Sequence, residues 1–224
     1  MSTPTVVVTG ANGRLGGRLS EALVEEASYR VAHIVRTEEQ AERLSRELGD
    51  DRGVFAADVT EDSAVEACFD RIGEEFGSIY GVIHTVGAWG ETPLVGGDPE
   101  SWRRMVDINL TSTYLVFRAA LGRLGDEGRL IAFTSEQGAD GGVGGQSAYS
   151  AAKAGVARLV ESAAEETASG VTVHAVAPSF IRFDPEAETS GVEPEEIVAA
   201  CRFLLDEAGR AFDGQILRAY GPAD

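Results

Sequence analysis

The sequence predicts an α/β fold, with one doubly wound parallel sheet of about seven strands and helices on both faces. Short β-branched runs alternate with longer segments of helical period along all 224 residues. Each run is apolar enough for a strand that is buried on both faces, and no repeat or low-complexity linker interrupts the alternation. A chain of this length with 43% hydrophobic residues can fill one sizeable core. We therefore expect a single domain over residues 1–224.

The strands and helices are expected to alternate in strict order. Strands are predicted at residues 5–9, 30–35, 53–57, 80–84, 128–134, 171–176 and 215–219. Helices are predicted at residues 14–27, 38–48, 61–76, 99–123, 147–168 and 194–206. The last helix begins at Pro194, where a proline followed by the carboxylates of Glu195 and Glu196 suits a helix N-terminus. This alternation leaves no spare segment for a separate substrate domain.

A glycine-rich turn joins the first predicted strand to the first predicted helix. Glycines at 10, 13 and 16 allow a tight turn, close packing of helix on strand, and approach of backbone N–H groups to a pyrophosphate. Such a turn alone is weak evidence. Its position directly after the first strand favours a dinucleotide site in a Rossmann-like sheet. The residues expected to contact the cofactor here are Gly10, Asn12, Gly13, Arg14, Leu15 and Gly16.

The end of the second predicted strand bears on the choice of dinucleotide. NAD sites often place a carboxylate there to bind the ribose 2′-hydroxyl, but this chain reads His33-Ile34-Val35-Arg36-Thr37. Arg36, and Arg14 in the glycine turn, are candidates to bind a 2′-phosphate instead. We therefore predict NADP as the preferred cofactor, with NAD as the alternative. The alternative interpretation is that both arginines are ordinary solvated side chains.

Tyr149 and Lys153 form the strongest catalytic signal. They lie four residues apart on a predicted helix, so the phenol and the ammonium share one face. An adjacent cation favours phenolate and is expected to lower the tyrosine pKa, which makes Tyr149 a usable general acid or base. A Tyr-x-x-x-Lys pair is common on exposed helices. Its combination with the glycine turn, the upstream Ser135 and the absence of any other lysine favours catalysis.

With these motifs the chain resembles the short-chain dehydrogenase/reductase family over nearly its whole length, in particular the compact branch that includes 3-oxoacyl-carrier-protein reductases. The resemblance implies that Ser135 holds the substrate carbonyl or hydroxyl and that Tyr149 transfers the proton. It also implies that Lys153 binds the nicotinamide ribose and that Asn109, within Val106-Asp107-Ile108-Asn109-Leu110, holds a water in the proton relay.

Further similar segments extend the expected cofactor site. The resemblance places Asp58 and Val59 at the adenine, and Pro178 and Ile181 beside the nicotinamide. It also implies a cofactor contact at Gly87, although the segment His84-Thr85-Val86-Gly87 keeps only the final glycine of the family's Asn-Asn-Ala-Gly. We expect His84 to be a packed or hydrogen-bonded histidine at a strand end.

Other departures concern the glycine turn and the substrate side. Gly13-Arg14 stands where the compact branch has its glycine one place later, Ser179 replaces a common glycine, and Phe183 stands where a threonine often meets the carboxamide. Relatives usually carry a longer helical lid than the stretch at about 181–193. This shortened lid predicts a more open site and weaker substrate selection.

The predicted function is an NAD(P)-dependent oxidoreductase that transfers hydride between the nicotinamide and a carbonyl or alcohol substrate. One alternative is a related epimerase, dehydratase, or quinone- or pteridine-type reductase, which the altered turn and the segment at 84–87 favour. Another is a non-catalytic sensor that binds dinucleotide without turnover. A pure binder has no need of Ser135 and Asn109, which argues against the sensor.

The charge balance limits the classes of partner. The formal net charge is −18, with 37 acidic against 19 basic residues, so the surface should repel nucleic acid. Lys153 is the single lysine among those basic residues. The acidic, lysine-poor composition suits either a high-salt habitat or an arginine-favouring genome.

We expect a cytoplasmic protein that acts on a small molecule. No apolar stretch reaches about 18 residues and no signal-peptide pattern opens the chain, so neither membrane spanning nor secretion is predicted. Cys68 and Cys201 lie far apart in helical segments and should pack as small apolar residues, with no disulfide or metal site. The resemblance implies a homodimer or homotetramer, built from the helices near 99–123 and 147–168.

Overall fold

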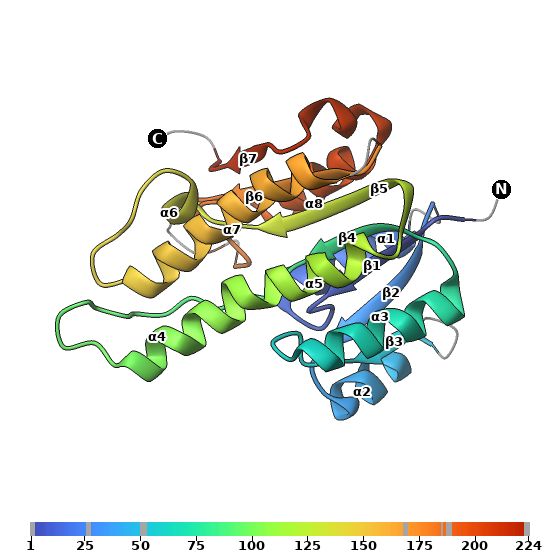
Figure 1. The fold of residues 1–224 in the computed structure, drawn as a ribbon, viewed down its shortest axis with the longest axis horizontal. Helices are drawn as coiled ribbons and strands as arrows, with labels where there is room; N and C mark the ends of the chain where they lie inside the picture. Colours follow the sequence, from blue (N-terminus) through green and yellow to red (C-terminus); the bar gives the residue numbers. More distant parts are fainter. Residues whose placement is uncertain are drawn as a thin grey trace.

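A seven-stranded parallel sheet organises the computed structural model, which describes residues 3–25, 28–49, 53–167, 170–184, 186 and 190–221. The strand order is β3-β2-β1-β4-β5-β6-β7, and every neighbouring pair is parallel (Figure 1). The strands are β1 (Thr5–Thr9), β2 (Arg30–Val35), β3 (Val54–Ala56), β4 (Ile79–His84), β5 (Leu124–Phe133), β6 (Thr172–Pro178) and β7 (Ile216–Ala219). The predicted doubly wound sheet is confirmed.

Helices cover both faces of this sheet. The helices are α1 (Arg14–Glu25), α2 (Glu38–Leu48), α3 (Asp62–Phe76), α4 (Pro99–Val106), the π-helical turn η1 (Asp107–Thr111), α5 (Ser112–Leu121), α6 (Glu136–Ala139), α7 (Ser147–Glu166), α8 (Pro194–Leu205) and the 3₁₀ helix η2 (Glu207–Phe212). One core packs α3, α5 and α7 against the sheet, and the other packs α1, α2 and α8. Cys68 in α3 and Cys201 in α8 are buried as small apolar side chains, as predicted.

Three local features differ from the prediction. The predicted helix at 99–123 is interrupted by the π turn Asp107–Thr111. The sequence did not predict this interruption, because the local pattern of apolar residues does not reveal a widened turn. Strand β5 begins at Leu124 rather than at 128, since a register shift against β4 accommodates the polar, glycine-rich residues 125–128. The short helices α6 and η2 were not predicted. Residues 26–27 and 168, at the ends of two predicted helices, lie outside the described residues.

The sheet topology places a crevice between β1 and β4. These strands are neighbours, with Thr9 paired with His84 at their carboxyl ends, but the chain leaves them towards opposite edges of the sheet. At such a switch point the connecting loops diverge and leave a ligand-binding crevice. None of the helices that the described residues form has the length and apolar character needed to cross a bilayer.

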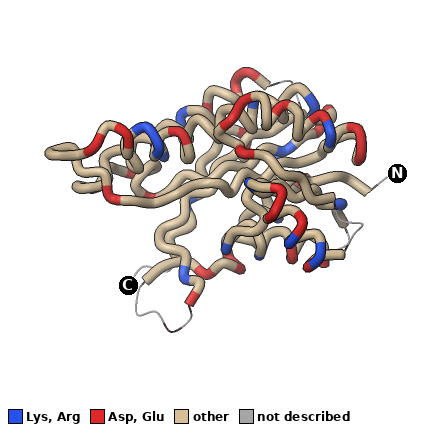
Figure 2. The backbone as a smooth tube through the Cα atoms, turned by 90° about the horizontal axis from the view of Figure 1, so that it is seen from below, with Lys and Arg blue, Asp and Glu red and all other residues tan. Residues whose placement is uncertain are grey.

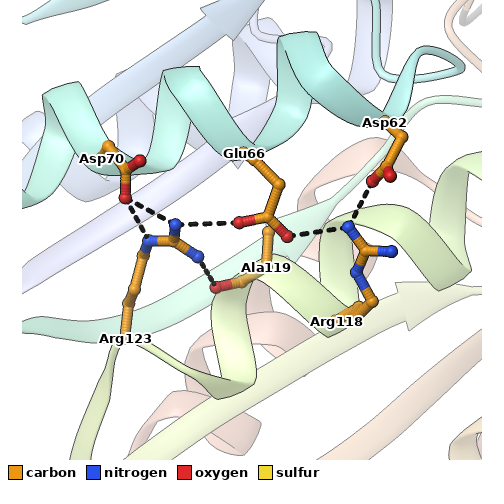
Figure 3. A network of polar contacts seen from close by, with 6 residues as sticks. All are labelled: Asp62, Glu66, Asp70, Arg118, Ala119 and Arg123. Carbon is orange, nitrogen blue, oxygen red and sulfur yellow. Dashed lines mark hydrogen bonds and ion pairs between the residues drawn. The ribbon is translucent and has the colours of Figure 1, made fainter.

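Acidic residues recur along the helices on both sides of the sheet (Figure 2), and one group of them ties α3 to α5. Glu66 accepts from Arg118 at 2.9 Å and from Arg123 at 2.8 Å, and each arginine also pairs with a second carboxylate, Asp62 or Asp70 (Figure 3). The hydrogen bonds from Arg118 and Arg123 lower the pKa of Glu66. The two helices are therefore joined by a chain of alternating charges.

We expect Glu66→Gln to lower the free energy of unfolding by up to about 1 kcal/mol at neutral pH and low salt, because partly exposed ion pairs contribute little each. The lowered pKa makes this contribution fully present above the ordinary glutamate value of 4.5, and it is lost as the pH falls through the lowered value. Urea unfolding at several pH values, in low salt and in 1 M salt, measures it. Glu74→Gln, at an exposed position on the same helix, is the control. If the unfolding free energies of Glu66→Gln and of the wild type differed by the same amount at every pH, the ionic explanation would be contradicted.

Candidate functional site

A cleft of about 740 Å³ opens at the carboxyl ends of β1 and β4. It brings together many residues that are far apart in the chain. The predicted site residues that line it are Gly10, Asn12, Gly13, Arg14, Leu15, Gly16, Gly87, Asn109, Tyr149, Lys153, Pro178 and Ile181. The glycine turn, the start of the predicted catalytic helix and the segment after β6 therefore face one space.

The glycine turn forms one wall of the cleft. Gly10 has a φ of 68°, and the N–H of Gly13 donates to its carbonyl at 2.8 Å. A Cβ on Gly16 would lie 2.2 Å from the Gly10 carbonyl oxygen, so the close approach of helix to turn requires glycine there. The turn ends at Arg14, the first residue of α1. The positive end of the α1 dipole therefore favours an anion at this wall.

The charge of the cleft is opposite to that of the whole protein. Among the described residues that line it, the charged ones are Arg14 and Lys153, although the net charge of the chain is −18. The Arg14 guanidinium lies 4.2 Å from the ring centroid of Phe183, so it is held across the cleft mouth by an aromatic contact. A glycine turn, a helix N-terminus and the Arg14 guanidinium fit the diphosphate of a dinucleotide.

Lys153 is a buried cation anchored to the sheet. Only 5% of it is exposed, and its Nζ donates to the carbonyl of Phe133 at 2.8 Å. Burial lowers the pKa of Lys153 to about 8. The same Nζ lies 6.0 Å from the ring centroid of Tyr149, one turn earlier in α7. The predicted pair thus shares one face of the helix.

Tyr149 lines the cleft, whereas the predicted catalytic residue Ser135 does not line it and lies beside the phenol. The Ser135 hydroxyl is near enough to the Tyr149 phenol to favour its ionised form. Ser135 is 4% exposed and caps α6, where its hydroxyl accepts from the Gly138 N–H at 3.2 Å. The predicted lowering of the Tyr149 pKa by Lys153 is wrong for this arrangement. Burial raises the pKa of Tyr149, the nearby Ser135 hydroxyl offsets only part of that effect, and the Lys153 ammonium is directed to the Phe133 carbonyl.

Asn109 lies inside the π turn and is fully buried. Its Oδ1 accepts from the Ala88 N–H at 3.1 Å, and its Nδ2 donates to the carbonyls of Ala88 at 2.9 Å and Met105 at 3.0 Å. A Cβ on Gly87 would lie 2.8 Å from Asn109 Oδ1 and 3.1 Å from Lys153 Nζ. Asn109 and Lys153 therefore both pack against the bare Cα of Gly87.

A second hollow of about 490 Å³ adjoins the cleft, and Ala88 lines both. Arg36 lines this hollow, and its Nε donates to Asp58 Oδ2 at 2.9 Å. Burial raises the pKa of Asp58, but bonds from Thr60 and Arg36 outweigh it, so the pKa is lowered. Arg14 and Arg36 thus serve separate hollows.

Two predicted cofactor residues line neither space. Asp58 acts on Arg36, as described, and Val59 packs in the core between the sheet and α3. His84 is buried between the hydroxyls of Thr9 at 2.8 Å and Ser112 at 3.2 Å, and burial lowers its pKa to about 3. The prediction of a packed, hydrogen-bonded histidine is confirmed.

The sequence did not single out Phe133 or Thr92 as site residues. Phe133 contributes only its carbonyl, which any residue type would supply, so no sequence signal exists for it. Thr92 bonds to the start of α7 through its hydroxyl and its carbonyl. The available signal for Thr92 was the proline that follows it, because a residue before proline is held extended.

Comparisons with known proteins agree with this fold. Residues 4–191 match the family described as short chain dehydrogenase. The chain is 32% identical to the 3-oxoacyl-[acyl-carrier-protein] reductase FabG of Vibrio cholerae, over 96% of this chain and 95% of the relative. It is 33% identical to cis-4-hydroxycyclohexanecarboxylate dehydrogenase of Sinomonas cyclohexanicum, over 96% and 94% of the two chains. The crystal structure of a short chain dehydrogenase from Mycobacterium smegmatis superposes with a TM-score of 0.88 at 29% identity, covering 100% of this chain and 94% of that one.

We expect Gly87→Ala to destabilise the protein by about 1–3 kcal/mol, because the added methyl overpacks the contact with Asn109 and Lys153. Gly141→Ala is the matched control, since a Cβ at Gly141 meets no described atom within 4 Å. Urea unfolding of both variants measures the difference. Equal unfolding free energies would mean that the two side chains do not close around position 87.

Proposed function

Because the chain belongs to the short-chain dehydrogenase family, it is an NAD(P)-dependent oxidoreductase, and we propose that Tyr149, Ser135 and Lys153 carry out its proton transfer. The nicotinamide, when bound, supplies or accepts the hydride. The observation that carries the proposal is that Tyr149 and the buried Lys153 line one cleft, with the Ser135 hydroxyl near enough to the phenol to lower its pKa. The substrate class is a small carbonyl or alcohol.

The three side chains divide the work in the reducing direction. The Ser135 hydroxyl donates to the carbonyl oxygen of the substrate and holds it near the phenol. Burial keeps the Tyr149 phenol protonated at neutral pH, so it gives its proton to the oxygen that becomes the alcohol. The Lys153 ammonium, charged below a pKa of about 8, is proposed to bind the nicotinamide ribose and so to hold the cofactor beside Tyr149, as the family resemblance implies. In the oxidising direction the same proton returns to Tyr149.

Asn109 supports this reaction by holding its surroundings. Its amide braces Ala88, and it packs beside Lys153 at Gly87. A water held between Asn109 and Lys153 would continue the proton path from the cleft to solvent, as the family resemblance implies. Asn109 would therefore serve the proton relay in two ways. Its amide would bind the water, and its hydrogen bonds to Ala88 would keep the neighbouring backbone in place.

The cofactor site is proposed to extend over both hollows. The glycine turn with Arg14 binds the diphosphate, and Gly87, Pro178 and Ile181 surround the nicotinamide half. Arg36 reads the adenosine half, where a 2′-phosphate would meet a guanidinium oriented by Asp58. NADP is therefore the preferred cofactor in this proposal, with NAD as the alternative.

We propose that the chain forms a single domain and that the substrate side of its cleft is open to solvent. The segment at about 181–193 is short and is closed at its base by a bridge between Ile181 and Val192, while residues 185 and 187–189 lie outside the described residues. A short lid covers little substrate, which favours broad selection among carbonyl compounds. The names of the V. cholerae and S. cyclohexanicum relatives likewise point to ketone and secondary-alcohol substrates.

Assembly and setting are also inferences. A homodimer or homotetramer would use the helices α4, α5 and α7, on which Trp102 and Tyr114 are 41% and 48% exposed. A cytoplasmic location without nucleic-acid partners suits the charge of −18 and the buried, unpaired cysteines. The acidic surface is consistent with a high-salt habitat.

We expect Tyr149→Phe to lower turnover by about 10²- to 10⁴-fold, because it removes the proton donor. The dissociation constant for reduced cofactor should stay near that of the wild type. Absorbance of the reduced nicotinamide with a panel of carbonyl compounds measures turnover, and fluorescence titration measures binding. Tyr114→Phe, on the exposed face of α5, is the control. Near-normal turnover of the Tyr149 variant would refute the assignment.

We expect Arg36→Ala to raise the dissociation constant for NADPH by about 10- to 100-fold, because it removes a charge-assisted bond to the 2′-phosphate. The constant for NADH should change little. Arg43→Ala, an exposed residue of α2, serves as the control. Equal losses for NADPH and NADH would show that Arg36 does not read the phosphate.

A further inference from the structure

The helix that carries Tyr149 begins without a cap of its own. Gln146, at the N-cap position, makes no side-chain bond to the first turn. The N–H of Ser150 donates to the Gln146 carbonyl at 2.9 Å and is the first to find its acceptor within the helix. The N–H groups of Ser147, Ala148 and Tyr149 therefore need acceptors from elsewhere.

Thr92 provides acceptors from a loop 55 residues earlier in the chain. Its Oγ1 accepts from the Ala148 N–H at 3.0 Å, and its carbonyl accepts from the N–H of Ser147 at 3.2 Å and from the Ser147 hydroxyl. The Thr92 N–H donates in turn to the Gly145 carbonyl at 2.7 Å. Thr92 is only 7% exposed, so these bonds are shielded from water. One residue thus caps α7 from outside the helix.

The local sequence suits Thr92 to this task. Pro93 follows it and disfavours helical backbone at position 92, and Thr92 forms an isolated parallel bridge with Gln146. A β-branched side chain has few rotamers, so the hydroxyl loses little freedom when it accepts the bond. The cap is therefore stiff as well as buried.

The same short segment is tied to the rest of the site. Ala88, four residues before Thr92, exchanges two hydrogen bonds with Asn109. Between them, the Trp89 indole lines the cleft and donates to the Gln146 side chain at 3.1 Å. Residues 88–92 therefore connect Asn109 to the first turn of α7.

We propose that Thr92 is a positioning residue for the reaction, because its cap holds the first turn of α7 and the Tyr149 phenol in place against Ser135. This inference rests on the proposed function of Tyr149. A frayed first turn would let the phenol move, and a displacement of about 1 Å can cost about a hundredfold in rate. Thr92 is not one of the residues proposed to touch the reacting atoms. Any effect of Thr92 on the reaction rate must therefore act through the position of Tyr149.

The test compares Thr92→Val, which keeps the branched shape and removes the acceptor, with Thr92→Ser, which keeps the hydroxyl. Thr167→Val is the matched control, because it removes a hydroxyl that donates to the Ala164 carbonyl at 3.1 Å, just beyond the other end of α7. We expect Thr92→Val to lower kcat about tenfold with an unchanged dissociation constant for NADPH. Thr92→Ser should stay within about twofold of the wild type, and Thr167→Val should match it.

Two further readouts separate positioning from general destabilisation. Amide hydrogen exchange at Ala148, measured without cofactor, should quicken in Thr92→Val and not in Thr92→Ser or Thr167→Val. The nearby Ser135 hydroxyl lowers the pKa of Tyr149, so a phenol that moves away from it should shift the Tyr149 limb of the kcat–pH profile upward in Thr92→Val alone.

Wild-type kcat and exchange in Thr92→Val would overturn the proposal. So would a Thr92→Ser variant as impaired as Thr92→Val, because the hydroxyl would then not be the operative group. Should Thr92→Val not fold, Thr92→Ala removes the same acceptor and carries the same expected outcomes. An active Tyr149→Phe would instead overturn the proposed function and leave the exchange result at Ala148 to decide the cap by itself.

Discussion

The candidate site depends on the hydrogen bond from Lys153 Nζ to the Phe133 carbonyl. A buried ammonium is costly unless a polar partner receives it, so this 2.8 Å bond holds α7 against the sheet. Phe133 ends β5, where it pairs with Val176 of β6, so its carbonyl is positioned by the sheet. Ser135 follows two residues later, and Tyr149 lies one turn earlier in α7. The bond between Lys153 and Phe133 therefore helps to place the Ser135 hydroxyl, the Tyr149 phenol and the Lys153 ammonium near one another.

Asn109, which lines the same cleft, provides a second brace. The π turn inserts an extra residue into the helical path, and Asn109 within it reaches the backbone of Ala88. From Ala88 the chain runs to Thr92, which caps the helix of Tyr149. The site is thus held between the central sheet and the loop at residues 88–92. This loop links η1, which carries Asn109, to the first turn of α7.

The fold and the cofactor turn were predictable because both are encoded locally. Alternating apolar runs predict the sheet, glycine spacing predicts the turn at Gly10, and a four-residue separation predicts that Tyr149 and Lys153 share a face. The π turn, α6 and the cap from Thr92 depend on contacts between distant segments, which a local pattern does not record. The pKa of Tyr149 was expected to fall and instead rises, because its direction depends on how much water the fold removes from the phenol.

The composition of the chain has a consequence for how it exchanges protons with solvent. Apart from histidine, every cationic side chain other than Lys153 is an arginine, and a guanidinium keeps its proton throughout the physiological range. His84 is held neutral by a pKa near 3, whereas Lys153 titrates near 8. Among the lysine and arginine side chains, the one whose charge changes near physiological pH therefore lies where the chemistry is proposed to occur. A mildly alkaline pH should therefore remove the charge of Lys153 at the reaction centre, while the arginines elsewhere in the protein keep theirs.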